Sequence, residues 1–434
     1  MNTDAILQEI SQHMSSDGRV CVAYSGGLDS TVLLHMVSQS SFSDRVTALH
    51  VNHQLSPNAA DWEKHCENTA LAFGVKFQSQ KVSVANSGRG LEQSAREQRY
   101  LALSSELKAN DLALFAHHRN DVAETFIFRL MRGTGLTGLK GIPRARSLGS
   151  GKGELLRPLL SYSRIQLARY ADDNGLKWID DESNEDSRFD RNFLRLELFP
   201  VLRSRWKNAE EKIAQAVDLL SEASSLLREY GEQDLAVCAR RSERLGESLS
   251  IGQLLVFSEA RQKHVIRLWC QLNRYSLPDR AQLTKLAEVL DARADAQPRL
   301  QWGTCELRRY GGRLYLLPCI EVGHRKEMPI VLNQRVNIGE SGEYIQCVTS
   351  AAGEVNQPLS LRFRSGQERC KPNDRAHSQT LKKLLQEYRL EPWLRDIVPL
   401  IYFGEELVAV GDIFVCDSPA YLPPDFSVIW GLST

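Results

Sequence analysis

The sequence lacks several features that mark other classes of protein. No apolar run approaches the roughly 20 residues that a membrane-spanning helix needs. The N-terminal segment, residues 1–14, is amphipathic and has neither the basic start nor the apolar stretch of a secretory signal. The 54 basic residues are balanced by 54 acidic ones, so any surface that binds nucleic acid must consist of local patches. We therefore expect a globular protein without a membrane anchor.

Paired cysteines are also absent. The chain has nine cysteines, and no two of them stand in a C-x-x-C pair. Scattered cysteines of this kind predict reduced, mostly structural thiols in a cytoplasmic protein. The sequence contains no internal repeat and no low-complexity tract either.

A glycine-rich segment, SGGLDS at residues 25–30, has no lysine inside it or just after it. It is therefore not the nucleotide P-loop, which needs G-x-x-x-x-G-K-[ST], and it lacks the G-x-G-x-x-G spacing of dinucleotide sites. Apolar residues at 20–24 precede it, and residues such as Leu34 and Val37 follow at helical spacing. The pattern predicts a buried strand, a tight turn and a helix.

This turn is suited to binding an anion. Gly26 and Gly27 permit a close backbone approach, and the unpaired N–H groups of the next helix attract phosphate. Ser25 and Ser30 add hydroxyl donors. Asp29 would repel phosphate unless a cation lies between them, which indicates Mg²⁺. Taken alone, the segment is equally compatible with an ordinary glycine-rich turn whose Asp caps a helix.

Strand and helix signals alternate through the first half of the chain. Strand signals lie at 46–53, 75–82 and 111–118, and helix signals at 58–74 and 90–108. Repeated βα units predict an α/β domain with a parallel sheet and helices on both faces. Ligands bind such sheets at the carboxyl ends of the strands. We therefore expect the loops after Tyr24, His53 and Phe115 to share one cleft.

The pattern changes near residue 206. Residues 207 to about 290 are almost wholly helical in pattern, and strand-like runs follow within 301–318. The predicted domains are a catalytic domain (1–206), a mainly helical middle domain (207–322), a linker with some β structure (323–358) and a small α+β domain (359–434).

A second motif, AHHRNDVAET at residues 116–125, combines imidazoles and carboxylates. A strand delivers His117 and His118 to its end, and a helix then places Asp121 and Glu124 on one face. The arrangement suits a metal site, a general base or capture of a cationic substrate. Acidic residues also favour helix N-termini for purely structural reasons.

A third motif lies within residues 180–202. Its acidic residues are Asp180, Asp181, Glu182, Glu185, Asp186 and Asp190. They precede a helix with Arg191 and Arg195, which are four residues apart and can clamp a phosphate or carboxylate. On composition alone, a capped helix with surface salt bridges is the favoured interpretation.

Together the motifs resemble a known family. SGGLDS resembles the pyrophosphate-binding loop of the N-type ATP pyrophosphatases. The chain as a whole resembles the tRNA(Ile)-lysidine synthetases in the order and spacing of its motifs. After SGGLDS these motifs are GLEQSAREQRY, H-x-x-D-x-x-ET, RGTGLTGL, RPLL and DESNEDSRFDRNFLR. The segment KKLLQEYRLEPWLRDIVPLIYFGEELVAVGDIFV resembles the last domain of that family, so the resemblance covers nearly the whole chain.

The resemblance implies a specific reaction. ATP would adenylate the C2 oxygen of the first anticodon cytidine in a tRNA(Ile) reading CAU. The ε-amine of free L-lysine would then attack C2 and expel AMP, which changes the tRNA from methionine to isoleucine identity. The implied cofactors are ATP and Mg²⁺. The implied partners are tRNA(Ile) and lysine, with no membrane and no obligate protein partner.

The resemblance also implies roles for residues. The nucleotide-binding set is Ser25, Gly26, Gly27, Leu28, Asp29 and Ser30, with Asp29 also reaching the metal. The implied catalytic set is Asp29, His117, His118, Asp121, Glu124, Arg191 and Arg195, and residues 50–53 would lie by the adenosine. Asp121 and Glu124 would bind the lysine ammonium, and Asp121 or a neighbouring His would take its proton. Arg191 or Arg195 would hold the lysine carboxylate or the adenylate phosphate.

The chain departs from the family pattern in places. Asn120 stands where many relatives have a second Asp, which argues against a two-carboxylate metal cluster there. His117 and His118 are both candidates for the active-site imidazole. The segment AHSQTLKKLL, residues 376–385, replaces a Gly-Gly-Arg-Lys start, so RNA contacts there are expected to differ in detail.

Basic residues outnumber acids between residues 362 and 383. The basic residues are Arg362, Arg364, Arg369, Lys371, Arg375, Lys382 and Lys383, and the acids are Glu368 and Asp374. A local positive field of this kind is expected to hold tRNA phosphates. A solvated surface with no RNA role is the alternative.

Other functions remain as alternatives. A tRNA 2-thiolating enzyme on the same loop would need paired cysteines, and a glutamine-dependent synthetase would need an amidotransferase domain, for which nothing after residue 206 has the pattern. A non-catalytic RNA-binding protein would not need the intact SGGLDS together with Asp121 and Glu124.

Overall fold

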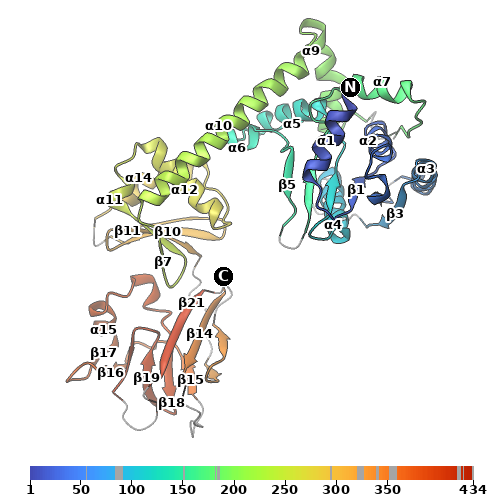
Figure 1. Ribbon diagram of the computed structural model, residues 1–434. Coiled ribbons are helices and arrows are strands. Elements are labelled where there is room, and N and C mark those ends of the chain that lie inside the picture. Colours follow the sequence, from blue (N-terminus) through green and yellow to red (C-terminus); the bar gives the residue numbers. More distant parts are fainter. Residues whose placement is uncertain are drawn as a thin grey trace. The chain divides into compact units, whose positions relative to one another are not determined.

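The computed structural model describes most of the chain. The described residues are 1–54, 56–83, 91–149, 152–180, 182, 186–293, 296–319, 327–338, 342–350, 359–417, 422–423 and 425–432. The chain separates into two compact units, Met1–Leu226 and Leu227–Thr434 (Figure 1). This division falls within the long helix α10 (Ala209–Val237). The predicted functional boundaries at residues 206, 322 and 358 stay predictions.

A six-stranded sheet forms the centre of the first unit. Its strands are β1 (Val20–Ala23), β2 (Val46–Asn52), β3 (Lys76–Lys81), β4 (Leu112–Leu114), β5 (Ala145–Ser147) and β6 (Glu154–Leu156). Their order is β3-β2-β1-β4-β6-β5, and only β5 pairs antiparallel to its neighbour. The first four strands confirm the predicted parallel sheet. Strands β5 and β6 have three residues each, too few for a sequence pattern.

Helices connect these strands and follow them. They are α1 (Thr3–His13), α2 (Leu28–Ser38), a 3-10 turn η1 (Ser43–Arg45), α3 (Ala59–Ala72), α4 (Leu91–Glu106), α5 (Arg119–Met131), α6 (Leu136–Leu139), α7 (Arg164–Asp173), α8 (Asp190–Phe193), a π-helical segment η3 (Leu194–Leu198) and α9 (Phe199–Arg205). Apolar side chains of α1, α2, α3 and α7 pack on one face of the sheet, for example Ile10, Leu33 and Leu167. Leu103 of α4 packs with Phe115 on the other face. The predicted two-sided covering of the sheet is therefore confirmed.

The order of the strands places the site. The chain runs from β1 to β2 to β3 on one side, and then returns to place β4 on the other side of β1. Val20 of β1 is level with Val46 of β2 and Leu112 of β4, so the carboxyl ends of these strands lie at one edge. In α/β sheets a ligand site forms where the strand order reverses in this way. The loops after β1 and β4 meet at that point.

Asp111 fixes the start of β4. Its carboxylate accepts hydrogen bonds from the Arg19 guanidinium (2.7 Å) and from the backbone N–H groups of Arg19 and Lys108 (3.0 Å each). Burial alone would raise the pKa of Asp111, but these hydrogen bonds outweigh it and lower the pKa. The carboxylate therefore stabilises the strand that carries the second motif.

The second unit contains antiparallel sheets. The strands of the first sheet are β7 (Arg241–Ser242), β8 (Glu247–Ser250), β9 (Arg299–Trp302), β10 (Cys305–Tyr310) and β11 (Arg313–Pro318), in the order β7-β8-β11-β10-β9. Its helices are α11 (Ile251–Leu254), α12 (Glu259–Leu272), α13 (Arg280–Thr284) and α14 (Leu286–Leu290). Strands β9 to β11 were predicted. Strands β7 and β8 interrupt the segment that we predicted as helical, because β8 pairs with β11, about 65 residues later in the chain.

The C-terminal part of this unit is α+β, as predicted. Its elements are β12 (Met328–Ile330), β13 (Arg335–Asn337), β14 (Glu343–Val348), β15 (Leu359–Arg362), β16 (Arg369–Cys370), β17 (Gln379–Thr380), α15 (Leu381–Glu387), a 3-10 turn η4 (Pro392–Leu394), β18 (Leu400–Phe403), β19 (Glu406–Val410), β20 (Phe414–Val415) and β21 (Ser427–Leu432). The segment predicted as a linker was expected to have some β structure, and its described residues include β12, β13 and β14. Strand β12 pairs with β15, and β14 pairs with β13 and β21. The bounds of the linker stay predictions.

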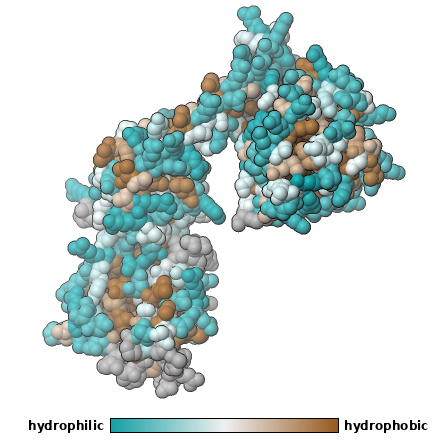
Figure 2. Space-filling model, in the orientation of Figure 1, coloured by the Kyte–Doolittle hydropathy of each residue, from teal (hydrophilic) through white to brown (hydrophobic). Residues whose placement is uncertain are grey.

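The surface is predominantly hydrophilic on the face shown in Figure 2, with separate apolar patches. Among the described residues, no helix is long and apolar enough to cross a membrane. All nine cysteines are free thiols, and eight of them are buried.

Candidate active site

The turn after β1 is held by its own serines. The Ser25 and Ser30 hydroxyl oxygens lie 3.1 Å apart, and Ser30 Oγ accepts a hydrogen bond from the Ser25 backbone N–H at 3.2 Å. Ser30 Oγ donates in turn to the Gly27 carbonyl at 3.1 Å. The two serines therefore shape the loop as well as offering hydroxyl groups to a ligand.

Gly26 is required by its surroundings. Its φ is +83°, a conformation that side chains rarely adopt. A Cβ atom there would lie 2.7 Å from Cys66 Sγ and 2.8 Å from Ile179 Cδ1. The Ile179 N–H donates to the Gly26 carbonyl at 2.9 Å, so a segment about 150 residues later closes over the loop. No other residue type fits this position without displacement.

The N-terminus of α2 is open to an anion. Gly27 is its N-cap residue and supplies no side-chain hydrogen bond to the first turn. The backbone N–H groups of this turn therefore lack a side-chain cap, which is the arrangement that attracts phosphate. Leu28 begins the helix and is buried, so its contribution comes from its backbone.

Asp29 lies in the first turn of α2. Its Oδ1 atom is buried and has no hydrogen-bond partner among the described residues. An unpaired carboxylate oxygen beside an anion site fits Mg²⁺, which binds one or two carboxylates and completes its shell with phosphate oxygens and water. Within the described part of the chain, no group of three or more His, Cys, Asp or Glu side chains is placed to hold a metal by itself.

His118 joins the two loops. It is the N-cap residue of α5, and the Asp121 carboxylate accepts its backbone N–H at 2.8 Å. Its ring lies between two acids, with Nε2 3.5 Å from Asp29 Oδ2 and Nδ1 3.5 Å from Asp121 Oδ2. His118 is 1% exposed. The predicted meeting of the loops after β1 and β4 is thus present.

Hydrogen bonding orients this imidazole. The Asn120 backbone N–H donates to His118 Nδ1 at 3.2 Å, so the neutral ring carries its proton on Nε2, toward Asp29. Burial works against a second proton on His118, but the carboxylates of Asp121 and Asp29 outweigh it and raise the pKa.

Glu124 and Arg195 form a bidentate ion pair. Arg195 Nε donates to Glu124 Oε1 and its terminal nitrogen donates to Oε2, both at 3.0 Å. The same guanidinium lies 3.9 Å from Asp121 Oδ1. Arg195 is in the π-helical segment η3, a distortion that is frequent at functional sites. Asp29, His118, Asp121, Arg195 and Glu124 are therefore linked by successive contacts.

Burial and neighbouring charges shift the pKa values of Asp121 and Glu124, the two acids of α5, in opposite directions. Glu124 is 1% exposed, and burial, followed by the charge of Asp121, raises the pKa of Glu124. Burial would also raise the pKa of Asp121, but the positive charge of His118 and its backbone N–H outweigh that effect and lower it. Asp121 is thus the more readily ionised of the two.

His117 faces another environment. Its Nδ1 accepts a hydrogen bond from Arg157 Nε at 3.3 Å, and its ring stacks on Phe115 with centroids 5.8 Å apart. Arg157 is 2% exposed and also donates to the Tyr100 hydroxyl at 3.1 Å. His118 is the imidazole whose ring lies 3.5 Å from both Asp29 and Asp121. The role predicted for His117 stays a prediction.

Other predicted residues take varied positions. Arg191 lies in α8, one turn before Arg195, and its role stays a prediction. Asp181 and Glu185 of the acidic run lie outside the described residues. Within the segment 50–53, His50 Nδ1 donates to the Tyr24 carbonyl at 3.0 Å, and burial lowers the pKa of His53 to about 4. His53 is therefore neutral at physiological pH.

Sequence reasoning missed the supports of the site. Arg157, which donates a hydrogen bond to His117, lies within the otherwise apolar segment LLRPLL. A charged residue in an apolar segment was the available sign of a functional or supporting role. Ile179, which closes over Gly26, gave no signal. Asn120 was noted as a departure, but its side-chain contact with Glu210, 90 residues later, was not predictable from spacing.

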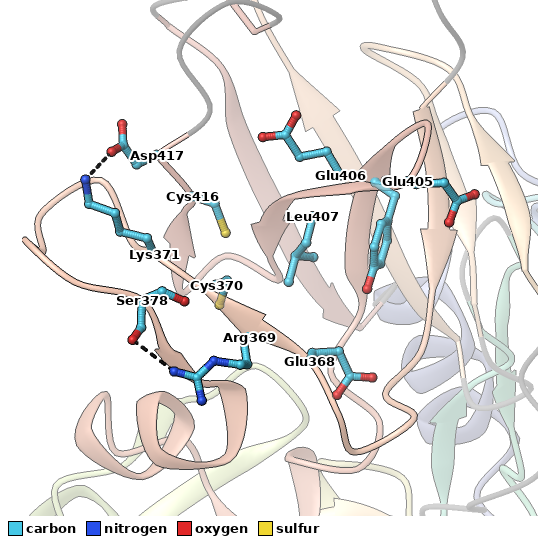
Figure 3. Close-up of a pocket in the computed structure, with 11 residues that line it drawn as sticks. Glu368, Arg369, Cys370, Lys371, Ser378, Glu405, Glu406, Leu407, Cys416 and Asp417 are labelled. Carbon is cyan, nitrogen blue, oxygen red and sulfur yellow. Dashed lines mark hydrogen bonds and ion pairs between the residues drawn. The ribbon is translucent and has the colours of Figure 1, made fainter.

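The basic cluster of the C-terminal part is largely paired with acids. Figure 3 shows a pocket of this region in which Lys371 Nζ is bound to Asp417 at 2.5 Å and Arg369 donates to the Ser378 carbonyl at 3.4 Å. Arg362 is bound to Glu327 and Glu405, each at 2.8 Å. Lys382 has no ion pair within the part of the chain that the structure describes. The unmatched positive field is therefore smaller than the sequence count predicted.

Comparisons with known proteins match the chain in three segments. The PP-loop domain family matches residues 2–202, the TilS substrate binding domain matches 249–315, and the TilS substrate C-terminal domain matches 359–425.

Whole-chain relatives cover almost the same length. A tRNA(Ile)-lysidine synthase of Coxiella burnetii (strain RSA 493 / Nine Mile phase I) is 38% identical over 417 residues, which are 93% of this chain and 91% of the relative. A tRNA(Ile)-lysidine synthase of Serratia proteamaculans (strain 568) is 38% identical over 428 residues, 96% of each chain.

Proposed function

The chain belongs to the tRNA(Ile)-lysidine synthase family, and from this premise we propose how its residues carry out the reaction. It is an ATP-dependent ligase that forms lysidine in tRNA(Ile). We propose that free L-lysine is the amine donor and that Mg²⁺ accompanies ATP. A cytoplasmic location is part of the proposal, because the substrate is a tRNA and all nine cysteines are free thiols.

One observation carries the proposal, namely the connected charge cluster beside the open N-terminus of α2. Three carboxylates, Asp29, Asp121 and Glu124, share one guanidinium, that of Arg195, and one imidazole. Within this cluster the carboxylates therefore outnumber the cationic groups. An electronegative site next to a phosphate-binding turn suits a reaction between a nucleotide and a cationic amine.

ATP binding is proposed for the turn after β1. The N–H groups of the first turn of α2, with the hydroxyl groups of Ser25 and Ser30, would hold the pyrophosphate part of ATP. Asp29 would hold Mg²⁺ through its unpaired Oδ1. When bound, Mg²⁺ neutralises phosphate charge and favours departure of pyrophosphate.

The first chemical step joins the tRNA to AMP. The C2 oxygen of the anticodon cytidine attacks the α-phosphorus, the bond to the β-phosphate oxygen breaks, and pyrophosphate leaves. Pyrophosphate departs into the donors of the α2 turn, which stabilise its charge without rearrangement. The adenylated C2 then has AMP as a leaving group.

The second step consumes lysine. Its ε-ammonium has an ordinary pKa of about 10.4 and must lose a proton before it attacks C2. We propose that Asp121 and Glu124 attract the ammonium and that Asp121 or His118 takes the proton. Because both Glu124 oxygens are bound to Arg195, Glu124 acts through charge and by fixing Arg195. Arg191 would bind the lysine carboxylate.

The experiment is incorporation of labelled lysine into an unmodified tRNA(Ile) transcript reading CAU. We expect incorporation that requires ATP, and pyrophosphate release only when tRNA is present. A tRNA(Met) with the same anticodon is the control and should be modified far less. Absence of lysine incorporation under these conditions would refute the proposed function, and incorporation of sulfur instead would favour a thiolating enzyme.

A further inference from the structure

Asn120 contacts the start of its own helix and two other helices through its polar groups. Its backbone N–H donates to His118 Nδ1 at 3.2 Å. Its side-chain Oδ1 accepts the backbone N–H of Arg164, the first residue of α7, at 3.1 Å. Its side-chain Nδ2 donates to Glu210 Oε1 at 3.1 Å. The Arg164 contact fixes the orientation of the amide, so that the NH₂ group must face Glu210.

Glu210 is a buried partner in the first turn of α10. Its side chain is 11% exposed, and the same Oε1 atom accepts a hydrogen bond from Arg203 Nε at 2.8 Å. Its neighbour Glu211 differs, because it is 45% exposed and lies 3.9 Å from Arg119. Glu210 is therefore the buried acid that joins α10 to the start of α5 by a hydrogen bond.

We propose that Asn120 and Glu210 are positioning residues for lysidine formation, an inference that rests on the proposed function. Their hydrogen bond holds the first turn of α5, which carries Asp121 and follows His118, against the first turn of α10. The two bonded residues are 90 positions apart in the sequence. The role of this bond is to fix where the imidazole and the carboxylate stand relative to the turn after β1.

The identity of residue 120 follows from this bond. An aspartate there would still accept the Arg164 N–H, but its second oxygen would face the Glu210 carboxylate at about the same 3.1 Å. Two carboxylates this close repel each other strongly. An asparagine donates where an aspartate would repel, so Asn120 and Glu210 are matched to each other.

The test is a polarity exchange across this bond. Asn120→Asp, Glu210→Gln and the double variant are compared with the wild-type chain for labelled lysine incorporation into tRNA(Ile) transcript, with kcat and the KM for tRNA measured separately. We expect Asn120→Asp to lower kcat about tenfold, a typical size for coupled neighbours, with the KM for tRNA within about twofold. The double variant removes the facing carboxylates, but its amide NH₂ then also lies opposite Arg203 Nε, which donates to Glu210 Oε1 in the wild type, so kcat should recover only in part.

Two further variants complete the test. Glu211→Gln is the matched control on the same helix and should leave kcat within about twofold of wild type. Glu210→Ala removes the hydrogen bond without placing two carboxylates together. If Asn120→Asp does not fold, the kcat of Glu210→Ala therefore tests whether the bond positions the active site. A fall in kcat with unchanged KM for tRNA supports the proposal.

Two results would overturn it. They are wild-type kcat in Asn120→Asp or in Glu210→Ala, and a change confined to the KM for tRNA. Failure of the proposed function is distinguishable, because the wild-type chain itself would then incorporate no lysine.

Discussion

Replacing Glu124 with glutamine would keep the shape of the side chain and remove its charge. In the native protein both Glu124 oxygens accept hydrogen bonds of 3.0 Å from Arg195, and Glu124 is 1% exposed. A glutamine accepts one of these bonds and turns an NH₂ group toward the other guanidinium nitrogen. The loss of one charge-assisted bond costs about 1.5–3 kcal/mol. Since the Arg195 side chain is 28% exposed and can be partly hydrated, we expect about 2 kcal/mol.

This loss has a thermal and a kinetic signature. For a unit of this size, about 2 kcal/mol lowers Tm by about 4–8 °C. Removing one negative charge from the cluster that we propose attracts the lysine ammonium should also raise the KM for lysine about tenfold, equivalent to about 1.4 kcal/mol. The KM for ATP should change less than about twofold, because the polar contacts of the Glu124 side chain are to Arg195 and not to the α2 turn.

The assays are thermal unfolding followed by circular dichroism, and initial rates of labelled lysine incorporation at varied lysine and ATP. Glu211→Gln is the control, because its partner Arg119 is 3.9 Å away and its side chain is 45% exposed, so its cost should stay within about 0.5 kcal/mol. Equal increases in the KM for lysine and for ATP would assign Glu124 to the fold or to nucleotide binding. An unchanged Tm would refute the stabilising role of the bidentate pair.

Four further outcomes follow from particular contacts. Asp29→Ala should lower pyrophosphate release about 100-fold or more, because the phosphates would lose the proposed metal bridge, and near-normal release would contradict the assignment. Gly26→Ala should lower the free energy of unfolding in urea by about 2–4 kcal/mol and raise the KM for ATP. The reason is that φ of Gly26 is +83° and that a Cβ atom would lie 2.7 Å from Cys66 Sγ and 2.8 Å from Ile179 Cδ1. Wild-type stability would contradict the packing described. Asp111→Asn should destabilise the protein more at pH 7 than at about pH 3, because the folded-state pKa of Asp111 is lowered. The stabilisation by the carboxylate is fully present above about pH 4 and is lost as the pH falls through the folded-state pKa. An equal loss of stability at both pH values, measured by chemical denaturation, would exclude this linkage. Combined Lys382→Ala and Lys383→Ala should weaken binding of all tRNAs. The slope of the logarithm of the binding constant against the logarithm of the salt concentration should become less steep by about 0.9 for each phosphate that is no longer neutralised. An unchanged slope in filter binding would assign both lysines to the solvated surface.

The sequence by itself determined the elements and the chemical character of the site. Local periodicity predicted strands β1 to β4 and the helices between them, because apolar spacing reports which side of each element is buried. The turn at residues 25–30 was predictable for the same reason, since its glycines and the following helix N-terminus act within six residues of each other. The resemblance of the ordered motifs then identified the family.

Tertiary structure decided which of these residues meet. Both His117 and His118 follow strand β4, and only packing turned one toward Arg157 and the other toward Asp29. Arg195 reaches Glu124 across 71 residues of sequence, in a π-helical segment that helical spacing did not predict.

The same limit applies to the strands and supports that the sequence did not locate individually. Strands β7, β12 and β14 are two to six residues long and take their conformation from partners elsewhere in the chain. The Asn120–Glu210 bond depends on how α5 and α10 are placed, and not on either local sequence. Periodicity is a property of one segment, whereas these contacts depend on the packing of two, and that is why only the folded chain contains them.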